Sequence, residues 1–157
     1  MRMRPRANDQ HPGYRALMEL LRTADTVWNA SRVFFGRWDL SPSQFNVLNL
    51  LRLNRVGLSQ SELSRQLIMH RSNVTGLVDR LEKRRLLARR EVAADRRAYR
   101  VVLTRAGTRL LRRILPRYYK EAVQAWGRLP ARRAAGLIAD LQQVSRKAQQ
   151  IAARGLR

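Results

Sequence analysis

The sequence predicts a mainly α-helical protein with one small β-hairpin, and two observations carry this prediction. Through most of the 157 residues, apolar side chains recur at steps of three and four, as they do along one face of an α-helix. Between residues 87 and 103 the apolar period changes to two, which is typical of β-strands. The expected fold class is therefore mainly α with a two-stranded hairpin.

We expect the first helix to cover residues 11–37, after a flexible basic arm formed by residues 1–10. Its apolar stripe contains Tyr14, Leu17, Leu21 and Phe35, and is wide enough to be buried on more than one side. His11, at the boundary between arm and helix, has no evident partner in the sequence.

Two shorter helices follow, and each has a clear start signal. Ser41 is expected as an N-cap with Gln44 completing a capping box, and this helix runs to about Leu53. Ser59 and Glu62 form a second capping box that starts a short helix. Residues 54–57 between the two helices are expected to form a loop or a very short strand.

The next expected helix spans residues 71–84 and has two distinct faces. Its apolar stripe consists of Val74, Leu77, Val78 and Leu81. At 100° per residue, the opposite face carries short polar groups near the helix start and cations near its end. These outward residues are Ser72, Asn73, Thr75, Gly76, Asp79, Arg80 and Lys83.

The change of period predicts strands at residues 87–92 and 99–103, with residues 93–98 as the polar tip. Thr104 is then expected to cap a long helix, which Pro116 should kink or divide. A last amphipathic helix covers residues 137–151, and residues 154–157 are expected to fray.

Composition narrows the classes of function. The chain carries 33 Lys and Arg residues against 11 Asp and Glu, for a formal net charge of +22. Such a charge favours a polyanionic partner, with nucleic acid as the first expectation and an anionic membrane surface as the second. Cysteine is absent, so we expect no disulfide and no thiolate metal site. No apolar run approaches the roughly 18 residues of a membrane-spanning helix.

The two capped helices, the helix with the polar face and the basic hairpin together predict a winged helix-turn-helix over residues 38–103. A recognition helix fits the major groove of DNA, and its first residues meet base edges. The residues expected to read bases or hold phosphate from this helix are Arg71, Ser72, Asn73, Thr75, Arg80 and Lys83. On the hairpin, Arg96 and Arg97 are suited to a narrow minor groove.

The stretch from Leu40 to Gly107 resembles the MarR family of bacterial transcription regulators. The resemblance rests on Leu40-Ser41-Pro42-Ser43-Gln44-Phe45, on Leu58-Ser59-Gln60-Ser61-Glu62-Leu63, on Val74-Thr75-Gly76-Leu77-Val78-Asp79-Arg80-Leu81-Glu82, and on Asp95-Arg96-Arg97 followed by Leu103-Thr104-Arg105-Ala106-Gly107. It implies a homodimer that represses transcription from a short inverted repeat. In that family pattern Asp95 orients Arg97, which enters the minor groove. An ordinary β-turn is the alternative interpretation of this pair.

The resemblance also implies an all-α dimerisation layer made by residues 11–37 and 104–153. The wide apolar faces of these helices independently favour a dimer, since one small winged domain cannot cover them. Many family members release DNA when a small, often phenolic, anion binds near that layer. Trp28, Arg32 and Phe45 are the candidates for such a pocket, with simple core packing as the alternative for the aromatic side chains.

Two positions depart from the family pattern. His70 stands where a small N-capping residue is usual, and Arg85 stands where similar sequences often have glycine. The second departure matters if the site is left-handed, because only glycine is comfortable there.

No arrangement of residues predicts an enzyme, a metal site or a cofactor. The two histidines are far apart in the sequence, and neither a P-loop nor a dinucleotide fingerprint is present. We therefore expect a cytoplasmic, nucleoid-associated regulator that binds double-stranded DNA at a pseudo-palindromic operator. The alternative is a non-specific or architectural nucleic-acid-binding protein, in which the charge supplies affinity without base reading.

Overall fold

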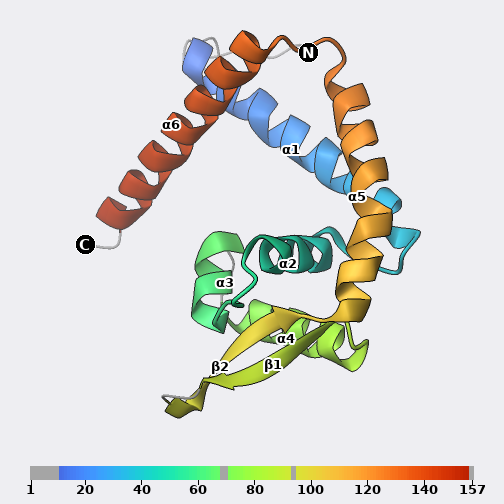
Figure 1. The fold of residues 1–157 in the computed structure, drawn as a ribbon. Coiled ribbons are helices and arrows are strands. Elements are labelled where there is room, and N and C mark those ends of the chain that lie inside the picture. The colour runs from blue at the N-terminus through green and yellow to red at the C-terminus, as the bar shows by residue number, and fades with distance from the viewer. Residues whose placement is uncertain (1–10, 68–70, 93–94, 156–157) are drawn as a thin grey trace, which may run out of the picture. The chain divides into compact units, whose positions relative to one another are not determined.

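The computed structural model describes residues 11–67, 71–92 and 95–155, with side chains outside the described part at 71, 92 and 95–98 (Figure 1). In chain order the elements are α1 (Pro12–Gly36), α2 (Pro42–Leu53), α3 (Gln60–Leu67), α4 (Arg71–Lys83), β1 (Leu87–Val92), β2 (Asp95–Leu103), α5 (Arg105–Trp126) and α6 (Ala131–Gly155). The predicted mainly α fold with a two-stranded hairpin is confirmed. The chain forms two compact units that divide between Arg112 and Arg113, within α5.

Both predicted capping boxes are present. At the start of α2, Gln44 N–H donates to Ser41 Oγ at 3.2 Å, and Ser41 N–H donates back to Gln44 Oε1 at 2.8 Å. At the start of α3, Glu62 N–H donates to Ser59 Oγ at 3.2 Å, and Ser59 N–H donates to Glu62 Oε2 at 2.7 Å. Each box satisfies two backbone donors that a helix start otherwise leaves free.

Helix α1 begins with a cap that the sequence did not reveal. The ring of His11 accepts a hydrogen bond from Gly13 N–H through Nδ1 at 3.1 Å, and the His11 carbonyl accepts from Arg15 N–H. Histidine is an uncommon N-cap, so no standard start signal marked the residue. Pro42 at the start of α2 and Pro12 at the start of α1 both occupy a first-turn position where proline needs no donor.

The hairpin is antiparallel, with Leu87 opposite Leu103 and Glu91 opposite Tyr99. Strand β2 begins at Asp95, so residues 95–98, which the sequence placed in the tip, belong to the strand; an irregular register at Glu91 and Val92 accommodates the shorter connection. Leu58 pairs with Val101 as an isolated bridge. The short strand expected near residues 54–57 therefore lies one residue later and borders the hairpin.

The core of the first unit gathers α2, α3, α4 and the hairpin (Figure 1). All four predicted stripe residues of α4 are buried, and so are Phe45, Leu48 and Leu51 of α2. Phe45 stacks on Phe35 of α1 with ring centroids 4.1 Å apart. Helix α4 is thus held on its inner side by apolar packing, which leaves its opposite face outward.

Two helices end on left-handed residues that are not glycine. Asp39 has φ 55° after α1 and Arg85 has φ 57° after α4. After α4, Leu86 N–H donates to Leu81 O and Arg85 N–H donates to Glu82 O, the two bonds of a Schellman motif. The left-handed site that the sequence flagged at Arg85 is therefore present, with arginine in place of the favoured glycine.

Helix α5 starts at the predicted cap, where Gly107 N–H donates to Thr104 Oγ1 at 3.0 Å. It runs as one helix through Pro116 to Trp126, so the proline does not divide it. Helix α6 continues to Gly155, which corrects the expectation that Arg154 and Gly155 fray; residues 156 and 157 lie outside the described part. None of the helices in the described ranges has the length and apolar character needed to cross a bilayer.

Candidate nucleic-acid interface

The outward face of α4 carries the predicted reading residues. Ser72, Asn73, Arg80 and Lys83 are exposed, while Thr75 is half-buried. Thr75 Oγ1 lies 3.4 Å from Gln60 Oε1, which joins the recognition helix to the first residue of α3. The polar groups near the start of α4 are therefore presented outward from a helix whose inner side is fixed in the core.

A shallow groove of 420 Å³ runs between the start of α2 and the outward face of α4. Its lining joins three predicted residues, Ser72, Asn73 and Arg80, to Ser41 and Ser43 of α2. Sequence reasoning treated Ser41 only as a cap and did not select Ser43. The signal that could have found them is the pair of serines, Ser41 and Ser43, on either side of Pro42 at a helix start.

Gly76 lies in the middle of α4 and borders the same groove. A β-carbon at this position would meet the Arg80 guanidinium at 3.5 Å, an ordinary contact distance. The guanidinium of Arg80 thus folds back over the part of the helix that has no side chain.

The side chains of four predicted site residues lie outside the described part of the structure. Arg71 begins α4, and Asp95, Arg96 and Arg97 begin β2, but these side chains lie outside the described part of the structure. The same holds for His70, one of the two departures from the family pattern. Their assignments as DNA-contacting or orienting residues stay predictions.

The guanidinium group of Arg89 on β1 makes its contacts inside the domain. Its guanidinium bonds to Asp79 Oδ1 at 2.5 Å and to the Glu82 carboxylate, both on α4, and lies 5.3 Å from the centre of the Tyr99 ring. Burial opposes the charged form, but the hydrogen bonds to Asp79 and Tyr99 and the charges of Glu82 and Asp79 outweigh it and raise the Arg89 pKa. This arginine fixes the hairpin to the recognition helix.

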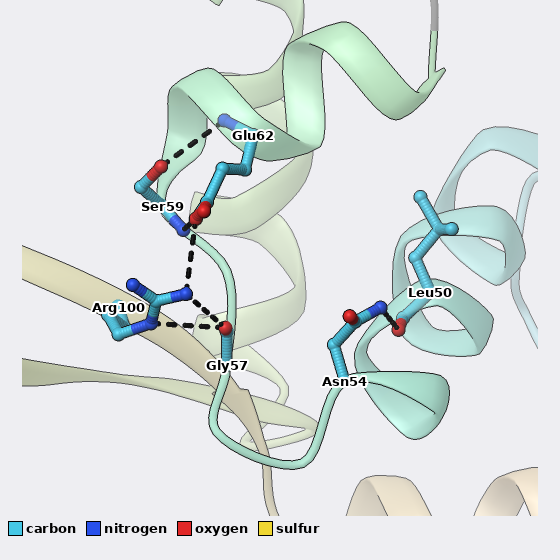
Figure 2. Close-up of polar contacts among 6 residues, drawn as sticks. All are labelled: Leu50, Asn54, Gly57, Ser59, Glu62 and Arg100. Atoms are coloured by element: carbon cyan, nitrogen blue, oxygen red, sulfur yellow. Dashed lines mark hydrogen bonds and ion pairs between the residues drawn. The ribbon is translucent and has the colours of Figure 1, made fainter.

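Arg100 on β2 is also engaged internally, as Figure 2 shows. It donates to the carbonyl oxygen of Gly57 from Nε at 3.1 Å and from Nη2 at 2.8 Å, and its Nη2 lies 3.3 Å from Glu62 Oε2. Gly57 has φ 87°, and a β-carbon there would lie 2.6 Å from Val102 Cγ1. Of the hairpin arginines whose side chains are described, only Arg90 is exposed.

Arg84 connects the ends of α1 and α4. Its guanidinium donates to Trp38 O at 3.1 Å and to Asp39 O, and lies 3.7 Å from the Asp39 carboxylate. The carbonyl groups at a helix end carry partial negative charge, so a guanidinium is favourable there. Arg84 thereby ties the first helix to the recognition helix.

The three candidates for an effector pocket differ in exposure, and their role stays a prediction. Phe45 is 1% exposed and belongs to the core, whereas Trp28 is 44% exposed on α1. Arg32 lines an open groove that contains neither aromatic residue. Among the described residues there is also no group of three or more His, Asp or Glu side chains that could hold a metal ion.

Comparison with known proteins shows similarity to one family of regulators. The model of the MarR family matches residues 38–98, the winged segment described above. The regulator PapX of Escherichia coli is 33% identical over 100 residues, which cover 62% of this chain and 61% of PapX. The repressor MprA of Escherichia coli K12 is 40% identical over 72 residues, which cover 46% of this chain and 41% of MprA.

A solved structure of BpsR from Bordetella bronchiseptica is 26% identical, with a TM-score of 0.73 over 90% of this chain and 98% of that one. Over its winged segment, residues 38–98, the chain matches the MarR family. The MarR family resemblance and its winged helix are thereby confirmed. The chain spans 61% and 41% of the two curated relatives. PapX is a transcriptional regulator and MprA is a transcriptional repressor, which agrees with the class of function predicted from sequence.

Proposed function

We propose that this protein is a sequence-specific DNA-binding transcription regulator. The observation that carries the proposal is the outward face of α4, on which exposed Ser72 and Asn73 precede exposed Arg80 and Lys83. Short polar groups at the start of a recognition helix can donate to and accept from base edges, and cations further along can hold phosphate. The apolar packing of Val74 and Leu81 keeps this face presented outward.

We assign two kinds of DNA contact to these side chains, to base edges and to the phosphate backbone. Asn73 reads bases because a side-chain amide can bond an adenine edge in two places. Arg80 and Lys83 hold the backbone, and Arg97, oriented by Asp95, enters the minor groove. Arg89 and Arg100 take no part in DNA contact, since their guanidinium groups are used inside the domain.

We further propose that the regulator acts as a homodimer on a pseudo-palindromic operator. Helix α1 exposes Leu17, Leu21, Val27 and Trp28, and α6 has no buried residue although it exposes Ile138, Leu141 and Val144. Exposed apolar area of this extent favours burial against a second copy. Residues 11–37 and 104–153 are the proposed dimerisation helices, and sedimentation of a compact monomer at micromolar concentration would contradict the assignment.

Repression and release by a small molecule complete the proposal. MprA is a transcriptional repressor, and the DNA binding of BpsR is regulated by 6-hydroxynicotinic acid. By analogy, we expect this protein to repress and to respond to a small aromatic or anionic effector.

Fluorescence anisotropy on the DNA upstream of the gene and on a scrambled duplex of equal composition, each over a salt series, tests the proposal. A regulator keeps a preference of about 10³-fold or more at physiological salt, whereas an architectural binder gives coincident curves that fall together.

Asn73→Ala should lower specific binding more than non-specific binding, while Lys83→Ala should weaken binding to all sequences alike and reduce the salt slope by about 1. Arg97→Ala should weaken binding through loss of the minor-groove contact, and unchanged affinity would contradict its role.

A further inference from the structure

The turn between α4 and β1 lies against the start of α5, within the first unit. Thr104, which caps α5, has its Oγ1 at 2.7 Å from the carbonyl oxygen of Arg85 and at 3.0 Å from that of Leu86. Gly107 packs on the same segment so closely that a β-carbon there would clash with the Leu86 carbonyl. The end of the recognition helix and the first turns of α5 therefore meet in one corner of the domain.

Three exposed arginine residues lie at this corner: Arg85 in the turn, and Arg105 and Arg109 on α5. We define them as the junction patch. Arg105 and Arg109 are four residues apart, so they share one face of α5 and are about 6 Å apart along its axis. Within the described ranges, none of the three forms an ion pair, and α5 carries no acidic residue before Glu121. The positive charge of the patch is therefore available to an external anion.

Two of these arginines stand where local structure favours another residue. Arg85 has φ 57°, a left-handed conformation that disfavours a β-carbon and that glycine usually adopts after a helix. Arg105 begins α5, where the helix dipole favours an acidic side chain and disfavours a cation. Strained backbone positions are concentrated at functional sites, where another requirement outweighs the local cost. The two placements therefore indicate a function for the charge itself.

The junction patch continues the cationic end of the recognition helix. Lys83 is the last residue of α4, and Arg85 follows two positions later. With 13 residues, α4 is about 20 Å long, whereas the major groove of DNA is about 12 Å wide. When the first turn of α4 meets base edges, its other end reaches the phosphate strand that borders the groove. Duplex DNA is therefore the anion that best fits the position of the patch.

We propose that Arg85, Arg105 and Arg109 form a second DNA-contacting surface, which holds the phosphate backbone beside the groove entered by α4. The guanidinium group suits this role because it can bond a phosphate through two N–H groups at once. Phosphate contacts carry no sequence information, so the patch adds affinity and fixes the orientation of α4 without adding base preference. This inference rests on the proposed function, because it takes α4 as the recognition helix.

The test measures the slope of log K against log salt, by fluorescence anisotropy, on the upstream duplex and on the scrambled duplex. Each lost phosphate contact lowers this slope by about 0.9. Arg85→Gly should therefore lower it by about 1, and the double variant Arg105→Ala with Arg109→Ala by about 2, on both duplexes alike. Arg85→Lys keeps a cation at the left-handed position and should keep the slope. Arg55→Ala, which removes the same charge from the exposed loop between α2 and α3, should leave the slope unchanged.

Arg85→Gly also separates DNA binding from folding. Glycine relieves the left-handed strain, so this variant should resist urea better than the unmodified protein while it binds DNA more weakly. A purely structural role of Arg85 would not produce these opposite changes.

An unchanged salt slope in either Arg85→Gly or the double variant would overturn the proposal. An equal decrease in Arg55→Ala would also overturn it, because the effect would then come from net charge and not from the junction patch. If the protein shows no preference for the upstream duplex, the proposed function fails, whereas the slopes on the scrambled duplex still test the patch by themselves.

Discussion

Arg89 on strand β1 bonds through Nη2 to Asp79 Oδ1 on α4 at 2.5 Å, and its backbone N–H donates to Glu82 Oε1 at 3.0 Å. The hairpin and the recognition helix are thus fixed to each other by charged hydrogen bonds in addition to apolar packing. Arg89 therefore serves to position the hairpin on the recognition helix. The Asp79 and Glu82 carboxylates are neutralised by the same contact.

We expect Arg89→Met to weaken DNA binding without changing its salt dependence. The substitution keeps most of the side-chain bulk but leaves Asp79 and Glu82 without a cation, and should destabilise the domain by about 1–2 kcal/mol. Because the guanidinium does not contact phosphate, the slope of log K against log salt should stay constant. Arg90→Met, at the exposed neighbouring position, is the matched variant and should lower that slope if Arg90 meets DNA. An equal decrease in the slope of log K against log salt in both variants would contradict the positioning role of Arg89.

Arg85 offers a route to a more stable protein. A left-handed residue other than glycine costs roughly 1–2 kcal/mol, part of which the greater freedom of glycine in the unfolded chain offsets. Arg85→Gly should therefore raise the free energy of unfolding by about 1 kcal/mol, as measured by urea denaturation. Arg85→Ala removes the same charge but keeps the β-carbon, so it should leave stability nearly unchanged. A gain of the same size in both variants would show that charge, not backbone conformation, is the cause.

Gly107 is predicted to be the least replaceable glycine in the described chain. A β-carbon there would lie 2.1 Å from the carbonyl oxygen of Leu86, which also accepts a hydrogen bond from Thr104 N–H. Since the obstacle is backbone, Gly107→Ala should destabilise the protein by roughly 3 kcal/mol or more. Gly136→Ala in α6 is the control, because nothing lies within 4 Å of its β-carbon, and it should stabilise by about 0.8–1.0 kcal/mol. Thermal unfolding at one protein concentration compares the two.

The features that the sequence predicted well are those that depend on neighbouring residues. The capping boxes at Ser41 and Ser59 need only residues three positions apart, and the period of α4 identified its buried face. The left-handed site at Arg85 was also accessible, because a family pattern places glycine there. Local chemistry therefore gave the elements and the outward face of the recognition helix.

The features that the sequence missed depend on pairs of residues far apart in the chain. Arg100 meets Gly57 and Arg84 meets Asp39 across about 45 residues, and a list of basic residues does not distinguish these from exposed ones. The groove rimmed by Arg32 and Arg80 likewise joins two helices whose proximity follows only from the folded core. Charge counts alone do not distinguish Arg89 and Arg100, which are engaged inside the domain, from exposed Arg90.

Glu62 should make stability depend on pH. Hydrogen bonds with the Ser59 backbone and side chain lower the pKa of Glu62 below its ordinary value of 4.5. Burial opposes this shift, and the positive charges of Arg100 and Arg65 assist it. A carboxyl group with a lowered pKa in the folded state stabilises fully above its unfolded pKa, and this contribution is lost as pH falls through the folded pKa.

Glu62→Gln isolates that contribution, because glutamine keeps the capping hydrogen bond but not the charge. At neutral pH the variant should be less stable by roughly 0.5 kcal/mol. Urea denaturation at a series of pH values should show the difference closing as pH falls below 4.5. A stability difference that persists in the acid range would show that the changed shape of the side chain, and not the lost charge, is its cause.

Gly76 should separate the stability of the recognition helix from its function. In mid-helix, glycine costs about 0.8–1.0 kcal/mol relative to alanine, and the nearest atom to a new β-carbon would be a mobile Arg80 nitrogen at 3.5 Å. Gly76→Ala should therefore raise the unfolding temperature. If the bare backbone serves close approach to DNA, the same variant should lose operator affinity, because the added methyl group enlarges the helix on its outward face. Anisotropy and thermal unfolding on one preparation decide the matter: a more stable protein with undiminished operator affinity would show that DNA does not approach at Gly76.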